Sequence, residues 1–151
     1  MAENQRIMKE VAADFTPQIH SPCCTLHVCT SCRAPGTPRK PKESRPGYQL
    51  FEEIKEALDE SPLRDQVKVL PAECLSICPR PCGIALSGAN RWTYLFGDQV
   101  PPVSVEDILE CVALYIETTD GFMPRERRPK SLRGSILGRI PTPVGAVDLN
   151  S

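Results

Sequence analysis

The sequence has few aromatic residues, 5% of its 151 residues, and it contains only two histidines. Two histidines are too few for a histidine-rich metal centre, and the chain shows neither a serine–histidine–aspartate set nor a phosphate-binding loop. Long apolar runs are missing as well. The longest strongly apolar stretch, residues 111–116, is far shorter than the roughly 20 residues of a membrane-spanning helix. We therefore expect neither an enzyme nor a membrane protein.

A charge excess of one sign is also missing, since 18 basic and 19 acidic residues leave a net charge of −1. A nearly neutral chain lacks the basic surface that nucleic-acid binding requires, so we expect no nucleic-acid partner. Residues 1–15 contain no apolar region of the secretory kind, which predicts a cytoplasmic location. In that reducing compartment the eight cysteines favour metal or thiol chemistry over a disulfide framework.

The hydrophobic pattern predicts one small α/β domain, of the α+β kind, over residues 23–120. The expected elements, in chain order, are a strand over 25–29, an amphipathic helix over 47–61, a strand over 67–70, a hairpin over 83–87 and 91–96, and a helix over 104–118. A strand–helix–strand unit followed by a hairpin and a closing helix packs as a small mixed sheet with two covering helices. This order predicts a thioredoxin-like arrangement.

The segments outside this pattern are predicted to be irregular. Residues 1–22 are mostly polar and are expected to be flexible, and residues 121–151 form a basic, proline- and glycine-rich tail that we expect to be extended. Residues 33–46 carry four prolines and five basic residues against one acidic residue, which predicts an exposed loop. The basic loop and tail would either lie on the acidic body of the domain or dock an acidic partner.

Two clusters of cysteines follow the first two predicted strands. Cys29 and Cys32 stand in V-C-T-S-C-R, and Cys74, Cys78 and Cys82 stand in E-C-L-S-I-C-P-R-P-C-G. Because neighbouring strands lie roughly 5 Å apart, the two clusters can meet at one edge of the sheet. Four thiolates at one point suit a tetrahedral zinc ion or an iron–sulfur cluster. The sequence therefore predicts a metal site built from Cys29, Cys32, Cys74 and Cys78.

A thiol–disulfide oxidoreductase is an alternative for the C-x-x-C pair, because such a dithiol also follows a strand. Its reactive thiol is activated by the N-terminus of a helix. Here fourteen residues of proline-rich loop separate Cys32 from the predicted helix, which argues against that activation. The C-x-x-x-C spacing of Cys74 and Cys78 is unusual for a zinc knuckle, which favours two intervening residues.

The C-L-S-I-C motif, followed by the hairpin I-A-L-S-G-A-N-R-W-T-Y-L-F and a closing helix, resembles the thioredoxin-like [2Fe-2S] ferredoxins. A closer resemblance is to the domain-of-unknown-function family 1636, predicted metal-binding proteins related to those ferredoxins. The resemblance covers about residues 25–143. The matching segments are V-C-T-S-C-R, C-L-S-I-C-P-R-P-C-G-I-A-L, R-W-T-Y-L-F-G-D, R-E-R-R-P-K-S-L-R and R-I-P.

The resemblance implies an electron carrier that holds a [2Fe-2S] cluster and exchanges single electrons with a redox or metal-handling protein. Members of the family are often found among bacterial cobalamin and metal-homeostasis genes, which suggests that context. The alternative is a zinc protein that uses the same cysteines for structure or metal delivery. The sequence leaves open whether the protein forms a homodimer.

Two details of the ligand set depart from the ferredoxin pattern. The ferredoxins have a wider spacing in the first pair, which Cys24 with Cys29 would restore, but five residues of strand span roughly 16 Å and would hold these two apart. Cys82 is an extra cysteine that could replace Cys78 or Cys74, serve as a reserve ligand, or remain free.

Three further cysteines and two arginines complete the candidates. We expect Cys111 to be a buried apolar residue of the second helix, and Cys23 and Cys24 to be non-ligands. Arg80, like Arg33, stands beside the proposed ligands. A guanidinium there would offset the negative charge of a four-thiolate cluster and raise its reduction potential, although an exposed loop charge is an equally good interpretation of Arg80.

Overall fold

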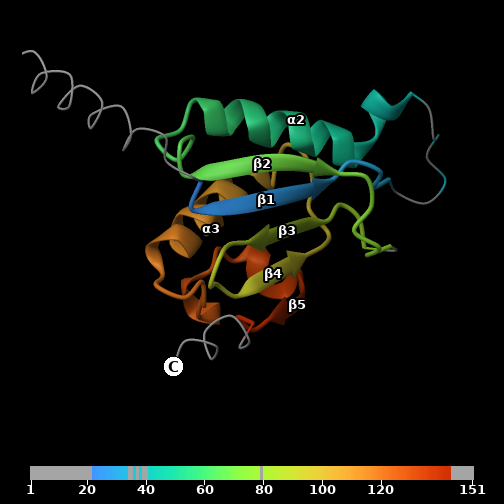
Figure 1. The fold of residues 1–151 in the computed structure, drawn as a ribbon. Coiled ribbons are helices and arrows are strands. Elements are labelled where there is room, and N and C mark those ends of the chain that lie inside the picture. Colours follow the sequence, from blue (N-terminus) through green and yellow to red (C-terminus); the bar gives the residue numbers. More distant parts are fainter. Residues whose placement is uncertain (1–21, 34–35, 37, 39–40, 79, 144–151) are drawn as a thin grey trace, which may run out of the picture.

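A mixed sheet forms the centre of the fold in the computed structural model, which describes residues 22–33, 36, 38, 41–78 and 80–143 (Figure 1). Its strands, within the described residues, are β1 (Cys24–Cys29), β2 (Val67–Ala72), β3 (Ile84–Ser87), β4 (Thr93–Phe96) and β5 (Ile136–Ile140). They lie in the order β2-β1-β3-β4-β5. The predicted two strands and hairpin are confirmed, whereas the prediction for residues 1–21 lies outside the described residues.

The pairing of the strands follows from their connections. β1 and β2 are parallel because the helix α2 (Pro46–Asp59) connects them, and the pairs β1–β3, β3–β4 and β4–β5 are antiparallel. The second long helix, α3 (Val105–Glu117), follows β4. This is the thioredoxin-like α+β arrangement that the sequence predicts. No helix in the described part of the chain is long and apolar enough to cross a membrane.

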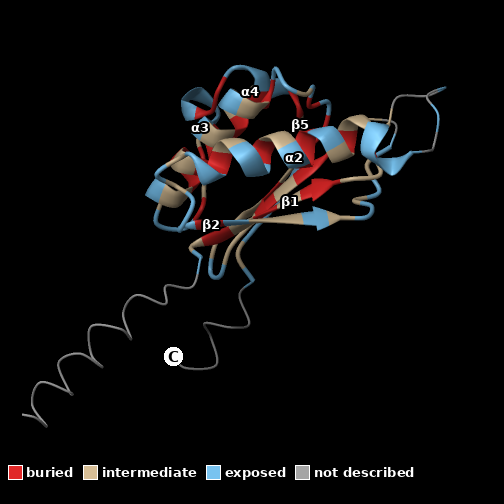
Figure 2. Cartoon of the chain, turned by 90° about the horizontal axis from the view of Figure 1, so that it is seen from above, coloured by how far each residue is buried: buried red, intermediate tan, exposed pale blue. Residues whose placement is uncertain are grey.

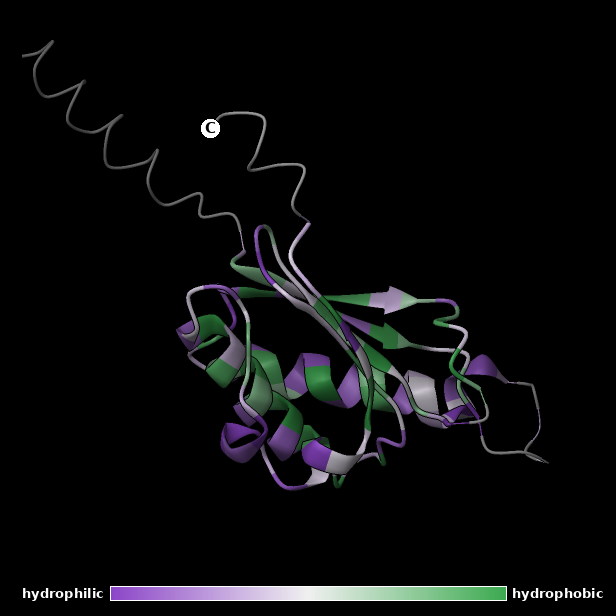
Figure 3. Ribbon diagram, turned by 90° about the horizontal axis from the view of Figure 1, so that it is seen from below, coloured by the Kyte–Doolittle hydropathy of each residue, from purple (hydrophilic) through white to green (hydrophobic). Residues whose placement is uncertain are grey.

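One face of the sheet is buried beneath the helices. In β1, β3 and β4 fully buried residues alternate with half-buried ones, as expected for strands covered on one side. Figure 2 shows α2 and α3 on one side of β1 and β2. Leu26 lies opposite Leu86, which lies opposite Tyr94, and all three are buried. The helices α2 and α3 contact each other on the same side of the sheet, where their hydrophobic and hydrophilic residues alternate in bands (Figure 3).

The segment after α3 corrects the prediction of an extended tail. It contains the short helices η3 (Arg125–Arg127) and α4 (Ser131–Gly134) and then β5, which pairs with β4 along Thr93–Ile140 and Leu95–Gly138. Leu132 and Met123 are fully buried. The sequence pattern did not reveal this strand because the prolines and glycines of residues 121–143 resemble those of a linker. β5 pairs with the edge of β4, which would otherwise be exposed.

Three buried acid groups should make the fold sensitive to alkaline conditions. Burial raises the pKa of Cys24 and of Cys111 to about 12, and it also raises the pKa of Tyr115. Cys111 Sγ lies 3.7 Å from Met123 Sδ, in the apolar setting predicted for it. The folded state keeps these protons where the unfolded state loses them, so stability is present below about pH 9 and falls as pH rises toward the folded pKa values.

We expect the free energy of unfolding, measured by urea denaturation, to fall steadily between about pH 9 and pH 11. In the Cys111→Ala variant the slope should be smaller by up to about 1.4 kcal/mol per pH unit, because one linked proton is gone. An unchanged slope in this variant would mean that Cys111 does not titrate upon unfolding.

Candidate metal centre

The parallel pairing of β1 and β2 brings both cysteine clusters to one edge of the sheet. Cys29, the last residue of β1, is paired with Ala72, the last residue of β2. The next residue, Thr30, donates from its backbone N–H and its hydroxyl to the Ala72 carbonyl, at 2.8 and 3.2 Å. The C-T-S-C turn is therefore tied to the end of β2, two residues before Cys74.

Cys29 and Cys32 lie at this edge with 2% and 1% of their surface exposed. The thiol of Cys32 donates a hydrogen bond to Cys29 Sγ, which is the largest cause lowering the pKa of Cys29, although burial opposes the shift. The same bond, together with burial, raises the pKa of Cys32. This hydrogen bond therefore favours a thiolate at Cys29 over a thiolate at Cys32.

Backbone amides point at these sulfurs from both cysteine clusters. The backbone amides of Leu75 and Ser31 act to lower the pKa of Cys29, and the amide of Gly83 acts to lower the pKa of Cys32. Leu75 is the residue after Cys74, so this contact places the second cluster directly beside the first. Hydrogen bonds from amides stabilise the thiolate form, which is the form that binds metals.

Cys82 is the third buried thiol at this edge, with 2% of its surface exposed. Burial, with the charge of Cys29, raises the pKa of Cys82 to about 11. Its backbone exchanges two hydrogen bonds with that of Gln99, at 3.1 and 3.3 Å, which anchor it to the segment after β4. Cys82 is thus near enough to Cys29 for the charge of Cys29 to affect the pKa of Cys82.

Cys74 and Cys78 are exposed on the loop that connects β2 to β3. The N–H of Ser76 donates to Cys74 Sγ at 3.3 Å, and Ser76 has a positive φ of 55°. Among the described residues, no three histidine, cysteine or acidic side chains are already gathered as a metal site. The predicted ligands are therefore divided between two buried thiols on a fixed turn and two exposed thiols on the adjoining loop.

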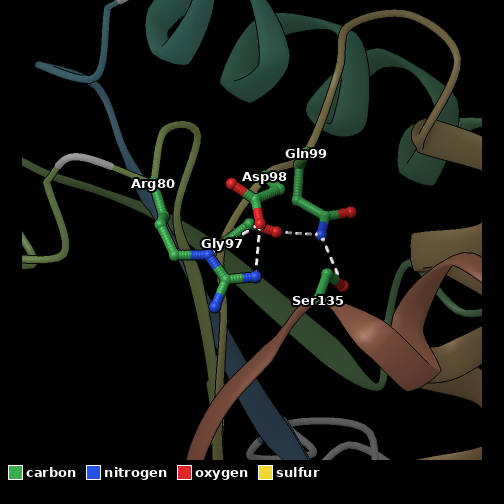
Figure 4. A network of polar contacts seen from close by, with 5 residues as sticks. All are labelled: Arg80, Gly97, Asp98, Gln99 and Ser135. Atoms are coloured by element: carbon green, nitrogen blue, oxygen red, sulfur yellow. Dashed lines mark hydrogen bonds and ion pairs between the residues drawn. The ribbon is translucent and has the colours of Figure 1, made fainter.

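Arg80 lies on the same loop and forms an ion pair with Asp98, to which its Nε donates at 2.8 Å (Figure 4). Asp98, in turn, donates from its backbone N–H to the Arg80 carbonyl at 3.3 Å. The adjacent Gln99 donates from Nε2 to the Gly97 carbonyl and to Ser135 Oγ, at 2.6 and 3.1 Å. Arg80 therefore carries a paired charge that holds the loop to the β4–β5 side of the sheet.

The start of α2 lies directly against the C-T-S-C turn, which corrects one step of the sequence argument. The two residues that flank the proline-rich loop are in contact, since the N–H of Gly47 donates to the Cys32 carbonyl at 3.0 Å. A Cβ at Gly47 would come within 2.1 Å of the Cys29 carbonyl oxygen and 3.0 Å of Cys32 Cβ. Cys32 and Gly47, at the start of α2, are therefore close in space although fourteen residues separate them along the chain.

Three residues of this centre were missed by the sequence argument: Gly47, Leu75 and Gly83. Leu75 and Gly83 act through their backbone amides, which leave no mark in a sequence. Gly47 did leave one, because a proline and a glycine at the first two positions of a helix indicate a close approach by other backbone.

The donor set fits a thiolate-bound metal group. Five cysteines lie at or after the ends of β1 and β2 at one sheet edge; the Ser76 amide donates to Cys74 Sγ, and nearby amides act to lower the pKa values of Cys29 and Cys32. Hydrogen bonds to sulfur are a normal feature of iron–sulfur and zinc–thiolate sites. Cys24 and Cys29 lie at opposite ends of the extended strand β1. The alternative ligand pair, Cys24 with Cys29, therefore does not meet at one site.

Comparisons with known proteins bear on the fold and the family. A family model described as a protein of unknown function, DUF1636, matches residues 26–142. A solved structure of a thioredoxin-like [2Fe-2S] ferredoxin from Aquifex aeolicus is similar, with a TM-score of 0.51 and 20% identity over 79% of this chain and 94% of that chain. A structure of the wild-type thioredoxin-like [2Fe-2S] ferredoxin from Aquifex aeolicus has a TM-score of 0.49 and 21% identity, over 78% of this chain and 99% of that chain. No curated protein matches the sequence. The first structural similarity confirms the predicted thioredoxin-like fold.

Proposed function

The chain belongs to this family of unknown function, DUF1636, and from that premise we propose that it is an electron carrier holding a [2Fe-2S] cluster. The proposed ligands are Cys29, Cys32, Cys74 and Cys78, with Cys82 as a reserve ligand. The proposed partner is a redox or metal-handling protein. The similar solved structures are described as thioredoxin-like [2Fe-2S] ferredoxins, which agrees with this choice of cofactor.

The observation that carries the proposal is the placement of the cysteines: Cys29 and Cys32 are buried on a turn that is hydrogen-bonded to the end of β2, two residues before Cys74. The amides of Leu75 and Gly83 support this placement, because they act to lower the pKa values of Cys29 and Cys32. Such amides favour thiolates over thiols, and thiolates are the ligands of an iron–sulfur cluster. A pair of ordinary core cysteines needs no such donors.

The placement of the ligands also suits electron transfer. When bound, a [2Fe-2S] cluster accepts and releases one electron. Cys29 and Cys32 exclude water from the inner side of the centre, since both are almost fully buried. Cys74 and Cys78 lie at the surface on the β2–β3 loop, where a partner protein can approach.

A thiol–disulfide oxidoreductase is less well supported. Its attacking thiol must reach a substrate disulfide. Cys29 is the thiol with the lowered pKa, yet only 2% of its surface is exposed. The nearby start of α2 would otherwise favour this chemistry, so it is the burial of both sulfurs that argues against it.

The proposal is tested by an ultraviolet–visible spectrum of protein purified without oxygen, with iron, sulfide and zinc assayed on the same sample. We expect a red-brown protein whose visible bands bleach with dithionite, and nearly equal amounts of iron and sulfide. A colourless protein with stoichiometric zinc, still colourless after iron–sulfur reconstitution, would overturn the proposal and favour the zinc alternative.

The reserve role of Cys82 gives a separate prediction. Because Cys82 already lies beside Cys29, we expect the Cys78→Ala variant to retain iron, with altered visible bands as Cys82 takes the vacant position. The double variant Cys78→Ala/Cys82→Ala should lose its iron and colour. Iron and sulfide content per chain is the measurement. A colourless Cys78→Ala single variant would rule out a reserve ligand.

A further inference from the structure

A surface cavity of about 480 Å³ opens beside β5, on a part of the fold that the proposed electron carrier does not use. Three of its six lining residues are arginines and two others are apolar. The lining residues are Arg125, Arg128, Ile136, Leu137, Gly138 and Arg139. All belong to the basic segment after α3, which was predicted to lie on the acidic body of the domain or to dock an acidic partner.

Arg128 is the unusual residue of this cavity. Only 4% of its surface is exposed, and it is the one charged residue that is buried among those the structure describes. Its Nε and Nη1 atoms are buried without a hydrogen-bond partner. Its guanidinium carbon lies 6.0 Å from the centre of the Tyr94 ring, a contact that attracts a cation but accepts no strong hydrogen bond.

No carboxylate compensates this charge. None of the ion pairs within the described residues includes Arg125, Arg128 or Arg139. Burial lowers the pKa of Arg128; Tyr94 and Cys111 oppose this shift, and the nearby charges of Arg125 and Arg139 add to it. A buried charge with unmet donors destabilises a protein unless something else pairs with it.

The other two arginines are held in position by separate contacts. The guanidinium of Arg139 lies 5.0 and 5.6 Å from the ring centres of Phe122 and Trp92. Arg125 donates from Nη1 to the Arg133 carbonyl at 3.2 Å. Neither contact neutralises the positive charge, so the cavity combines three fixed cations with an apolar wall.

We propose that this cavity binds a small organic oxyanion whose phosphate or carboxylate group pairs with Arg128. Guanidinium groups recognise these anions through paired, charge-assisted hydrogen bonds. Ile136 and Leu137 offer an apolar surface for the rest of the molecule. The apolar residues beside the arginines favour an organic ligand over an inorganic anion. This inference does not rest on the proposed cluster.

The test uses the full chain and two probes, inorganic phosphate and succinate, in calorimetric titrations at constant ionic strength set with chloride. We expect saturable binding of at least one probe, and a rise in melting temperature on its addition that chloride does not produce. Tighter binding of phosphate would assign a phosphorylated ligand, and tighter binding of succinate a carboxylated one. No saturable binding of either probe would overturn the proposal.

The Arg128→Met variant separates a ligand-binding role from a structural role. It should bind the probe on the order of tenfold more weakly or worse. Without the probe it should melt at the same temperature as the wild type or higher, because an unpaired buried charge has been removed. A matched control is Lys130→Gln, which removes one exposed charge of the same segment and should leave binding unchanged.

The alternative outcomes are distinct. Equal loss of binding in Lys130→Gln would show nonspecific charge attraction and overturn the site. Unchanged binding in a folded Arg128→Met variant would do the same. If that variant does not fold, Arg128 is structural, and the Arg139→Gln variant then decides, since weaker binding supports the site and unchanged binding overturns it.

Discussion

The Cys29→Ala variant is expected to be colourless and free of iron after the same purification and reconstitution that colour the wild type. Cys29 is the sulfur on which the site converges, since the Cys32 thiol and the Leu75 amide both donate to it. The reserve role proposed for Cys82 concerns Cys74 and Cys78, so the loss of Cys29 leaves Cys32 as the one buried ligand of the first pair. Iron, sulfide and the visible spectrum are the measurements.

The control for this prediction is Cys23→Ala. Cys23 is half-buried at the opposite end of β1 and is expected to be a non-ligand. It should retain wild-type iron and colour, while circular dichroism confirms that both variants are folded. A Cys29→Ala protein with full iron and sulfide content would refute the ligand assignment, whatever the state of Cys23→Ala.

The Gly47→Ala variant is expected to lose about 3 kcal/mol of stability, although alanine is the better helix former. The added Cβ would lie 2.1 Å from the Cys29 carbonyl oxygen, and this neighbour is backbone that cannot rotate away. Either α2 or the C-T-S-C turn must move. Because the turn holds Cys29 and Cys32, the variant should also contain less iron than the wild type.

Urea denaturation of the metal-free proteins and iron content of the reconstituted ones measure the two effects. Gly134→Ala is the matched control, because a Cβ at that helical position meets nothing within 4 Å. It should change stability by less than about 1 kcal/mol.

The Gly83→Ala variant is expected to lose less stability than Gly47→Ala, since its Cβ would meet the flexible end of the Ile77 side chain. Wild-type stability in Gly47→Ala would contradict the close approach of α2.

The elements with strong periodicity could be predicted from the sequence. The amphipathic pattern over 47–61 corresponds to α2, which runs from Pro46 to Asp59, and the hairpin pattern corresponds to β3 and β4. β5 could not be predicted in this way, since residues 136–140 include a glycine and an arginine and lack a clear alternation. Its strand form depends on pairing with β4, a contact between segments about 40 residues apart.

The candidate site could be predicted only as a set of side chains. The spacing of the cysteines and the strands before them predicted that two clusters would meet at one edge, and the pairing of Cys29 with Ala72 places the ends of the two strands side by side. The spacing said nothing of burial. It therefore did not distinguish Cys78, which is exposed, from Cys82, which is buried beside Cys29.

The sequence by itself determined the fold class and the family, because these depend on periodicity and on motifs within short segments. Only the tertiary structure decided which amides point at the sulfurs, that α2 begins against Cys32, and that Arg128 is buried without a partner. Each of these depends on backbone from distant segments meeting in space. Backbone amides are common to almost all residues, so their positions are set by packing and not by residue type.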